Sequence, residues 1–197
     1  MIRPKLHHVT FKTTRLDEMI AWYETVIGAK VQFRDRSAAW TTNDEANHRI
    51  AFLAVPGLSD DEQKTRHNGM HHCAFEYDSF DALMASFDRL RKANIEPAFC
   101  LDHGMTISLY YKDPEGNFVE LQSDVFGDWA KSSNFMRTSA DFAGNPIGIL
   151  RSRARLRGAE IGRRFQDAAK LHAGGRLPTG PASKYRTAGG MKGFPPK

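Results

Sequence analysis

The chain contains an internal repeat. The segment Leu6–Phe11, with the sequence LHHVTF, recurs as Met70–Phe75, with the sequence MHHCAF, at an offset of 64 residues. The helical patterns that follow both segments keep the same offset. A duplication of this length indicates two copies of one supersecondary unit, neither of which buries its apolar face alone. The sequence therefore predicts two similar modules packed against each other, with His8 and His72 in equivalent places.

Each copy predicts a strand, a helix and three further short strands. Alternating residues over 5–12 and 69–77 are typical of half-buried strands, and the apolar stripe over 16–27 is typical of a helix packed on a sheet. A second helix is expected from Phe80 towards Asn94. The other predicted strands are 30–33, 38–42 and 49–55 in the first module, and 96–100, 107–111 and 117–122 in the second. The fold class is therefore α+β, with paired βαβββ modules over 5–55 and 69–122 in one domain, 1–123.

The sequence changes character after residue 123. We expect a C-terminal extension over 124–173 with a helix over Arg155–His172, followed by a flexible basic tail over 174–197. Residues 1–148 carry 16 Lys/Arg against 21 Asp/Glu, whereas residues 149–197 carry 12 against 2. We expect the basic arm to lie on an acidic surface, of its own domain or of a neighbouring subunit in a homo-oligomer. Nucleic-acid binding is disfavoured because no aromatic residues alternate with the arginines.

Cysteine content and hydropathy favour a soluble cytoplasmic protein. Cys73 and Cys100 are the only cysteines and form no CxxC motif, which is typical of reduced thiols. Residues 1–5 lack the apolar run of a signal peptide. No stretch approaches the roughly 18 apolar residues that a spanning helix needs, so no membrane association is expected.

Three side chains form a candidate metal site. His8 and His72 converge if the modules pair face to face, and Glu120 shares their strand face because Val119 and Leu121 face the core. Two histidines and one carboxylate form the facial triad of non-heme Fe(II), and these donors also accept Mn(II). The alternative is a set of hydrogen-bonded polar side chains in a metal-free relative.

Two neighbouring histidines are not expected to be ligands. His7 and His71 are predicted to lie on the strand face opposite the triad, as surface or core-edge residues.

The first module lacks a counterpart of Glu120. When a gap of five residues pairs Asp44 with Asp113, Glu120 falls opposite Ala51, which cannot bind a metal. A Lewis-acid isomerase on this scaffold would need a fourth protein ligand there, whereas an oxygenase must leave that side open. Ala51 therefore favours an oxygenase.

The run from His103 to Glu120, HGMTISLYYKDPEGNFVE, resembles the signature of the type I extradiol catechol dioxygenases of the vicinal oxygen chelate superfamily. Residues 5–123 are similar to one-domain members of the dihydroxybiphenyl dioxygenase kind. The resemblance implies a single barrel-like domain in which His8, His72 and Glu120 bind Fe(II). It further implies that His48 is an acid/base residue and that His103 and Tyr110 hydrogen-bond the catechol oxygens. His48 could instead cap a turn, and Tyr110 could be an ordinary strand tyrosine.

By this resemblance the protein is a homo-oligomeric oxidoreductase of aromatic compound degradation. It is expected to cleave 2,3-dihydroxybiphenyl or another 3-substituted catechol with O2, giving a yellow semialdehyde-type acid. The alternatives are a metal-free or metal-binding sequestering protein, such as an antibiotic-binding relative, and an isomerase or thiol transferase of the same superfamily. Metal analysis after chelator treatment distinguishes the dioxygenase from the first alternative, and oxygen uptake distinguishes it from the second.

Overall fold

The computed structural model describes residues 2–151. The first module consists of β1 (Val9–Thr13), α1 (Leu16–Ile27), β2 (Lys30–Arg34), β3 (Ala38–Thr42) and β4 (Ile50–Ala54). A 3-10 turn, η1 (Lys64–Arg66), lies in the connection to the second module. That module consists of β5 (His72–Glu76), α2 (Phe80–Lys92), β6 (Phe99–Asp102), β7 (Thr106–Lys112) and β8 (Phe118–Asp124). The chain continues with α3 (Trp129–Thr138), α4 (Ala140–Gly144) and β9 (Ile149–Arg151).

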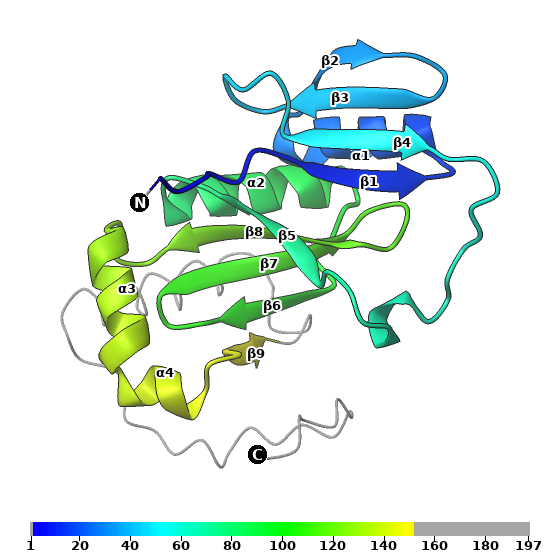
Figure 1. The fold of residues 1–197 in the computed structure, drawn as a ribbon. Coiled ribbons are helices and arrows are strands. Elements are labelled where there is room, and N and C mark those ends of the chain that lie inside the picture. Colours follow the sequence, from blue (N-terminus) through cyan, green and yellow to red (C-terminus); the bar gives the residue numbers. More distant parts are fainter. Residues whose placement is uncertain (1, 152–197) are drawn as a thin grey trace.

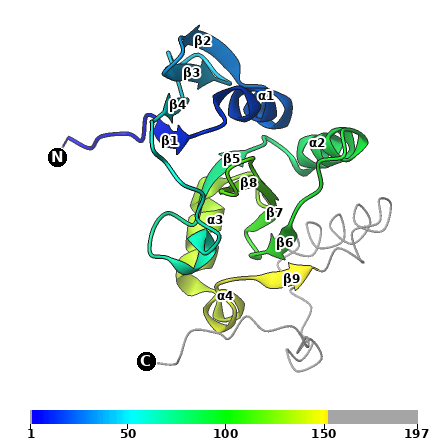
Figure 2. The ribbon, with the colours of Figure 1, turned by 90° about the vertical axis from the view of Figure 1, so that its right-hand side faces the viewer.

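The strands form two mixed sheets, one in each module (Figure 1). Their orders are β1-β4-β3-β2 and β5-β8-β7-β6-β9, with β1 parallel to β4 and β5 parallel to β8. Figure 2 shows α1 and α2 on the same side of the two sheets. The predicted α+β class with two βαβββ modules is confirmed. Among the described residues, no helix is long and apolar enough to cross a membrane.

Strand register confirms the internal symmetry. Ala51 lies between Thr10 of β1 and Trp40 of β3, whereas Glu120 lies between Ala74 of β5 and Tyr110 of β7. Thr10 and Ala74 are 64 residues apart, as are His8 and His72. Ala51 of β4 and Glu120 of β8 therefore occupy equivalent positions in the two modules, as predicted.

Helix α1 has the predicted bounds, and the residue that ends it explains why. Gly28 follows α1 with φ +71°, in the left-handed conformation that glycine adopts without a Cβ penalty, and its N–H bonds the carbonyl of Glu24. At the start of α2, the Ser79 hydroxyl accepts a hydrogen bond from the N–H of Ala82. Strong apolar periodicity and these local signals fix both helices.

The two modules share their apolar core. Val26 of α1 belongs to the cluster formed by α2 and the second sheet, with Leu83, Phe87, Leu90 and Leu121 among its members. Val119 of β8 belongs to the cluster formed by α1 and the first sheet. Because Val119 and Leu121 face the helices and are fully buried, Glu120 between them faces the opposite side of the sheet.

Some boundaries differ from those predicted. Strand β1 begins at Val9 and not at residue 5, because its partner β4 begins at Ile50, the residue in register with Val9. Strand β5 likewise begins at His72, in register with Phe118. Strand β6 begins at Phe99, after Pro97, which has no N–H to give to a ladder.

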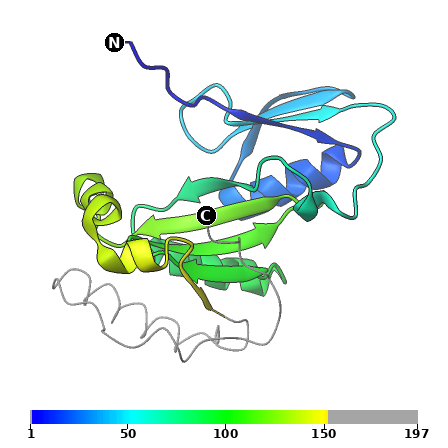
Figure 3. The ribbon, with the colours of Figure 1, turned by 60° about the horizontal axis from the view of Figure 1, so that its bottom comes forward.

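The region after β8 contains structure that the sequence pattern did not predict. Helices α3 and α4 lie at one end of the second sheet (Figure 3), and β9 pairs with β6 and widens that sheet. The Asp128 carboxylate starts α3 by accepting hydrogen bonds from the N–H groups of Ala130 and Lys131. The predicted helix over Arg155–His172 and the tail over 174–197 lie outside the described residues.

Candidate functional site

The structure brings two of the predicted metal ligands together. Nε2 of His72 lies 2.8 Å from Oε2 of Glu120, on adjacent parallel strands. The Glu120 side chain is 6% exposed and that of His72 is 32% exposed. A buried carboxylate is costly unless it is paired, and Glu120 is paired with the His72 imidazole and with the Tyr110 hydroxyl.

Tyr110 and His103 lie next to this pair. Tyr110 of β7 is in register with Glu120, is 3% exposed, and places its hydroxyl 3.3 Å from Nε2 of His103. Burial and then the charge of Glu120 raise the pKa of Tyr110 above its ordinary range. The phenol therefore stays protonated near neutral pH and can donate a hydrogen bond. His103 follows β6 and is held by a hydrogen bond from its N–H to the carbonyl of Thr106.

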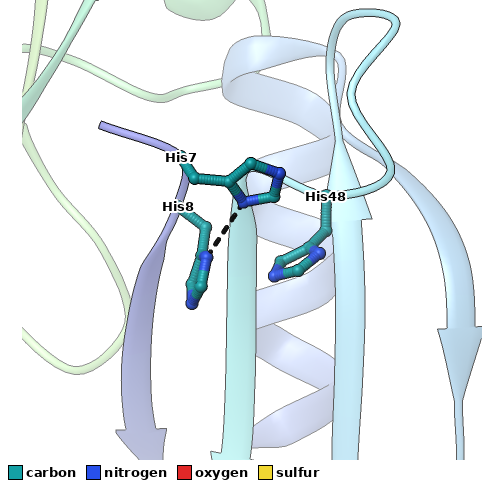
Figure 4. A group of neighbouring side chains, drawn as sticks. All are labelled: His7, His8 and His48. Carbon is teal, nitrogen blue, oxygen red and sulfur yellow. Dashed lines mark hydrogen bonds between the residues drawn. The ribbon is translucent and has the colours of Figure 1, made fainter. Parts of the chain in front are cut away.

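His8 and His48 form a second pair, in the first module. Their ring centroids are 4.4 Å apart, and the ring of His7 lies 5.0 Å from that of His48. Figure 4 shows the three imidazoles side by side at the start of β1 and β4. Desolvation lowers the pKa of His48, and the neighbouring His8 and His7 lower it further. The Nδ1 atom of His48 contacts Oδ1 of Asn47 at 2.7 Å.

The three predicted ligands do not meet at one point in this structure. Over residues 2–151, the donor atoms that lie in a group of three within 4.8 Å come from His7, His8 and His48. His72 and Glu120 form their own pair. The three predicted ligands thus belong to two separate pairs. His8 lies beside His48, and His72 contacts Glu120.

His7 and His71 are exposed, as predicted, but the prediction that they lie on a strand face is wrong. They precede β1 and β5, so neither lies on a strand face opposite its neighbour. Nδ1 of His7 is 3.0 Å from Nδ1 of His8, and Nδ1 of His71 is 2.7 Å from Nδ1 of His72. The repeated His-His doublet was the signal that could have indicated these contacts.

The residues present suit a divalent transition metal. An imidazole nitrogen and a carboxylate oxygen already lie 2.8 Å apart at His72 and Glu120, and imidazole with carboxylate is the donor set of Fe(II) and Mn(II) sites. The protonated Tyr110 hydroxyl and His103 supply donors for an oxygen-bearing ligand beside that pair.

Comparisons with known proteins identify the family of the chain. Residues 5–121 match the family described as the Glyoxalase/Bleomycin resistance protein/Dioxygenase superfamily. Biphenyl-2,3-diol 1,2-dioxygenase 2 of Rhodococcus globerulus is 38% identical over 146 residues, covering 74% of this chain and 76% of that protein. Biphenyl-2,3-diol 1,2-dioxygenase 3 of the same organism is 37% identical over 135 residues, covering 68% and 71%.

A solved structure shows the same fold. It is a glyoxylase/bleomycin resistance protein/dioxygenase domain from Frankia sp. EAN1pec, with a TM-score of 0.51 and 20% identity over 62% of this chain and 93% of that one. Family match, relatives and fold point the same way, and the chain belongs to the glyoxalase/bleomycin resistance protein/dioxygenase superfamily.

Proposed function

We propose that this protein is a metal-dependent extradiol dioxygenase that opens a catechol ring beside its two hydroxyl groups with O2. The observation that supports it best is the buried Glu120 carboxylate on the His72 imidazole, with Tyr110 in register beside it. The two Rhodococcus relatives, both named biphenyl-2,3-diol 1,2-dioxygenases, support the substrate class. The proposed substrate is 2,3-dihydroxybiphenyl or another 3-substituted catechol.

Fe(II) is the proposed metal, held by His8, His72 and Glu120, and Mn(II) suits the same donors. When bound, the metal would supply the redox chemistry that dioxygen needs and would make the catechol hydroxyls more acidic. The His72–Glu120 contact supports this set, and the position of His8 in the equivalent place of the repeat supports its third member.

Three side chains would handle the catechol and its protons. The Tyr110 hydroxyl and the His103 ring lie within 3.3 Å of each other and would hydrogen-bond the catechol oxygens, which fixes the ring. Oδ1 of Asn47 only accepts hydrogen bonds, so Nδ1 of His48 carries the proton there and Nε2 remains basic. With its pKa lowered, His48 is neutral near pH 7 and would take a proton from a catechol hydroxyl at Nε2 and return it later.

Anaerobic reconstitution with Fe(II), dialysis and a panel of substituted catechols test this proposal. We expect about one iron per chain to be retained and visible absorbance to develop when air is admitted, most strongly with 3-substituted catechols. Chelator-treated protein is the control. Ligand binding without oxygen uptake would instead support a metal-free sequestering protein, and turnover that continues without oxygen would support an isomerase or transferase.

We further propose a soluble, cytoplasmic homo-oligomer in which the basic segment contributes to subunit association. The charge difference between residues 1–148 and 149–197 supports this arrangement. Deletion from Gly148 should lower the mass of the assembly in solution, whereas deletion after Gly174 should leave both mass and iron content unchanged. An unaltered mass after the longer deletion would contradict the proposal, and steeply salt-dependent binding to duplex DNA by the full chain would restore a nucleic-acid partner.

A further inference from the structure

The turn between β7 and β8 reaches across to the first module. This turn, residues 113–116, contacts the junction between β1 and α1, residues 13–15. Oε1 of Glu115 accepts hydrogen bonds from Oγ1 of Thr13 at 2.5 Å and from the N–H of Thr14 at 2.9 Å. Nη1 of Arg15 lies 3.3 Å from Oε2 of Glu115 and donates to the carbonyl of Pro114 at 2.9 Å. We call these contacts of Glu115 with residues 13–15 the cross-module latch.

Glu115 is a half-buried residue whose carboxylate points into the latch. Its side chain is only 9% exposed, although Glu115 lies in the turn between β7 and β8. A carboxylate at this depth is tolerated only with charge-assisted partners, and all three partners within residues 13–15 belong to the other module. Nζ of Lys64, in the connection between the modules, also donates to the Glu115 carbonyl at 3.0 Å. The latch therefore joins the modules through one carboxylate.

The position in the first module that corresponds to Glu115 lacks a carboxylate. The alignment that pairs Ala51 with Glu120 also pairs Ala46 with Glu115, and Ala46 has no carboxylate to offer. Ala46 lies in the connection between β3 and β4 that also carries His48. Ala46 consequently cannot make this contact at the end of the first module that presents His8 and His48, and the latch acts from the opposite end of β1.

Strand β1 connects the latch to the proposed metal site. All five residues of β1, Val9–Thr13, are in register with β4, so the strand moves as a unit of the first sheet. His8 immediately precedes this strand and Thr13 ends it. A shift of Thr13 relative to the β7–β8 turn would therefore shift His8 relative to His72 and Glu120, which lie in the second module.

We propose that Glu115 is a positioning residue that sets the placement of the first module, and with it His8, relative to His72 and Glu120. This inference rests on the proposed metal site for its functional consequence, while the placement of the modules can be measured without metal. Glu115 itself is separate from the proposed ligands and from the side chains that would contact the catechol.

The first test measures the distance between the modules in metal-free protein. Spin labels at Glu45→Cys and Glu96→Cys, both exposed positions, report on the first and second modules. Burial raises the pKa of Cys100 to about 12 and that of Cys73 to about 11, so both native thiols react slowly at neutral pH. Glu115→Ala should shift or broaden the distance distribution, and Glu115→Gln should restore most of it because its amide oxygen still accepts from residues 13 and 14.

Glu62→Ala is the matched control, because Glu62 is an exposed glutamate in the connection between the modules. It should leave the distance distribution as in the wild type. An unchanged distribution in Glu115→Ala would overturn the proposal, as would an equal change in the control.

The second test measures Mn(II) affinity in a double-mutant cycle. Glu115→Ala should weaken Mn(II) binding on the order of tenfold, in the range found for residues that orient ligands from outside the ligand set. In a His8→Ala background the same substitution should have no further effect, because its influence passes through His8. Equal weakening in both backgrounds would mean a general loss of structure and would refute the positioning role. A wild type that binds no Mn(II) or Fe(II) would refute the proposed metal site. The distance measurement would then be the only test of whether Glu115 sets the placement of the modules.

Discussion

Tyr23→Phe removes a buried hydroxyl that links the two modules through Asp113 and also interacts with Cys73. The Tyr23 hydroxyl donates to Oδ2 of Asp113 at 3.2 Å, and both side chains are buried. A hydrogen bond to a charged group contributes about 1.5 to 3 kcal/mol. Asp113 keeps its hydrogen bonds from the N–H and Nδ2 of Asn117, both at 2.8 Å, and no cavity of methyl size is created. We therefore expect the free energy of unfolding to fall by about 1.5 kcal/mol, the lower end of this range.

Urea unfolding at pH 7 measures this loss as a lower midpoint at unchanged slope. For a domain of this size the loss corresponds to a fall in Tm of roughly 3 to 6 °C. Tyr111→Phe is the control, because Tyr111 is equally buried and its hydroxyl has no hydrogen-bond partner within the described residues. That variant should be neutral or slightly stabilising. Equal destabilisation in the two variants would show that ring packing, and not the bond to Asp113, explains the effect.

Three further predictions concern the proposed site and the latch. Glu120→Gln should abolish iron retention and turnover in a folded protein, and full activity would contradict the metal set. His48→Gln should retain iron and catechol binding but turn over on the order of 10² to 10⁴ times more slowly, measured by product absorbance. Burial opposes the ionisation of Glu115, but hydrogen bonds from Thr13 and Thr14 and the charges of Arg15 and Lys64 lower its pKa overall. Because the pKa of Glu115 is lower in the folded state, its ionised form contributes to the free energy of unfolding at pH 7, and this contribution is lost on acidification. The difference in stability between the wild type and Glu115→Gln should therefore disappear below about pH 4. A larger difference in acid would refute this prediction.

Local signals explain which parts of the fold could be predicted from the sequence. The bounds of α1 and β3 follow from strong periodicity and, for α1, from Gly28. Glu120 was expected to face away from the core because its neighbours on β8 are apolar, and the structure pairs it with His72. Short-range patterns of this kind do not depend on distant partners.

Features set by distant contacts were not predictable in the same way. Strand β9 exists because it pairs with β6, about 50 residues earlier, and its own sequence is too short to show a pattern. The Glu115 latch joins residues 102 positions apart, and nothing near Glu115 distinguishes it from an ordinary turn residue. His7 was misplaced because β1 starts at Val9, a limit set by the partner strand β4.

Oxygen consumption per catechol tests the central proposal most directly. Iron-loaded wild type should consume one O2 per 2,3-dihydroxybiphenyl with no added reductant, while a visible product accumulates in equal amount. Glu120→Gln, treated with iron in parallel, should consume none. Iron-loaded wild type that binds the catechol and takes up no oxygen, across the panel of 3-substituted catechols, would contradict the assignment as an extradiol dioxygenase.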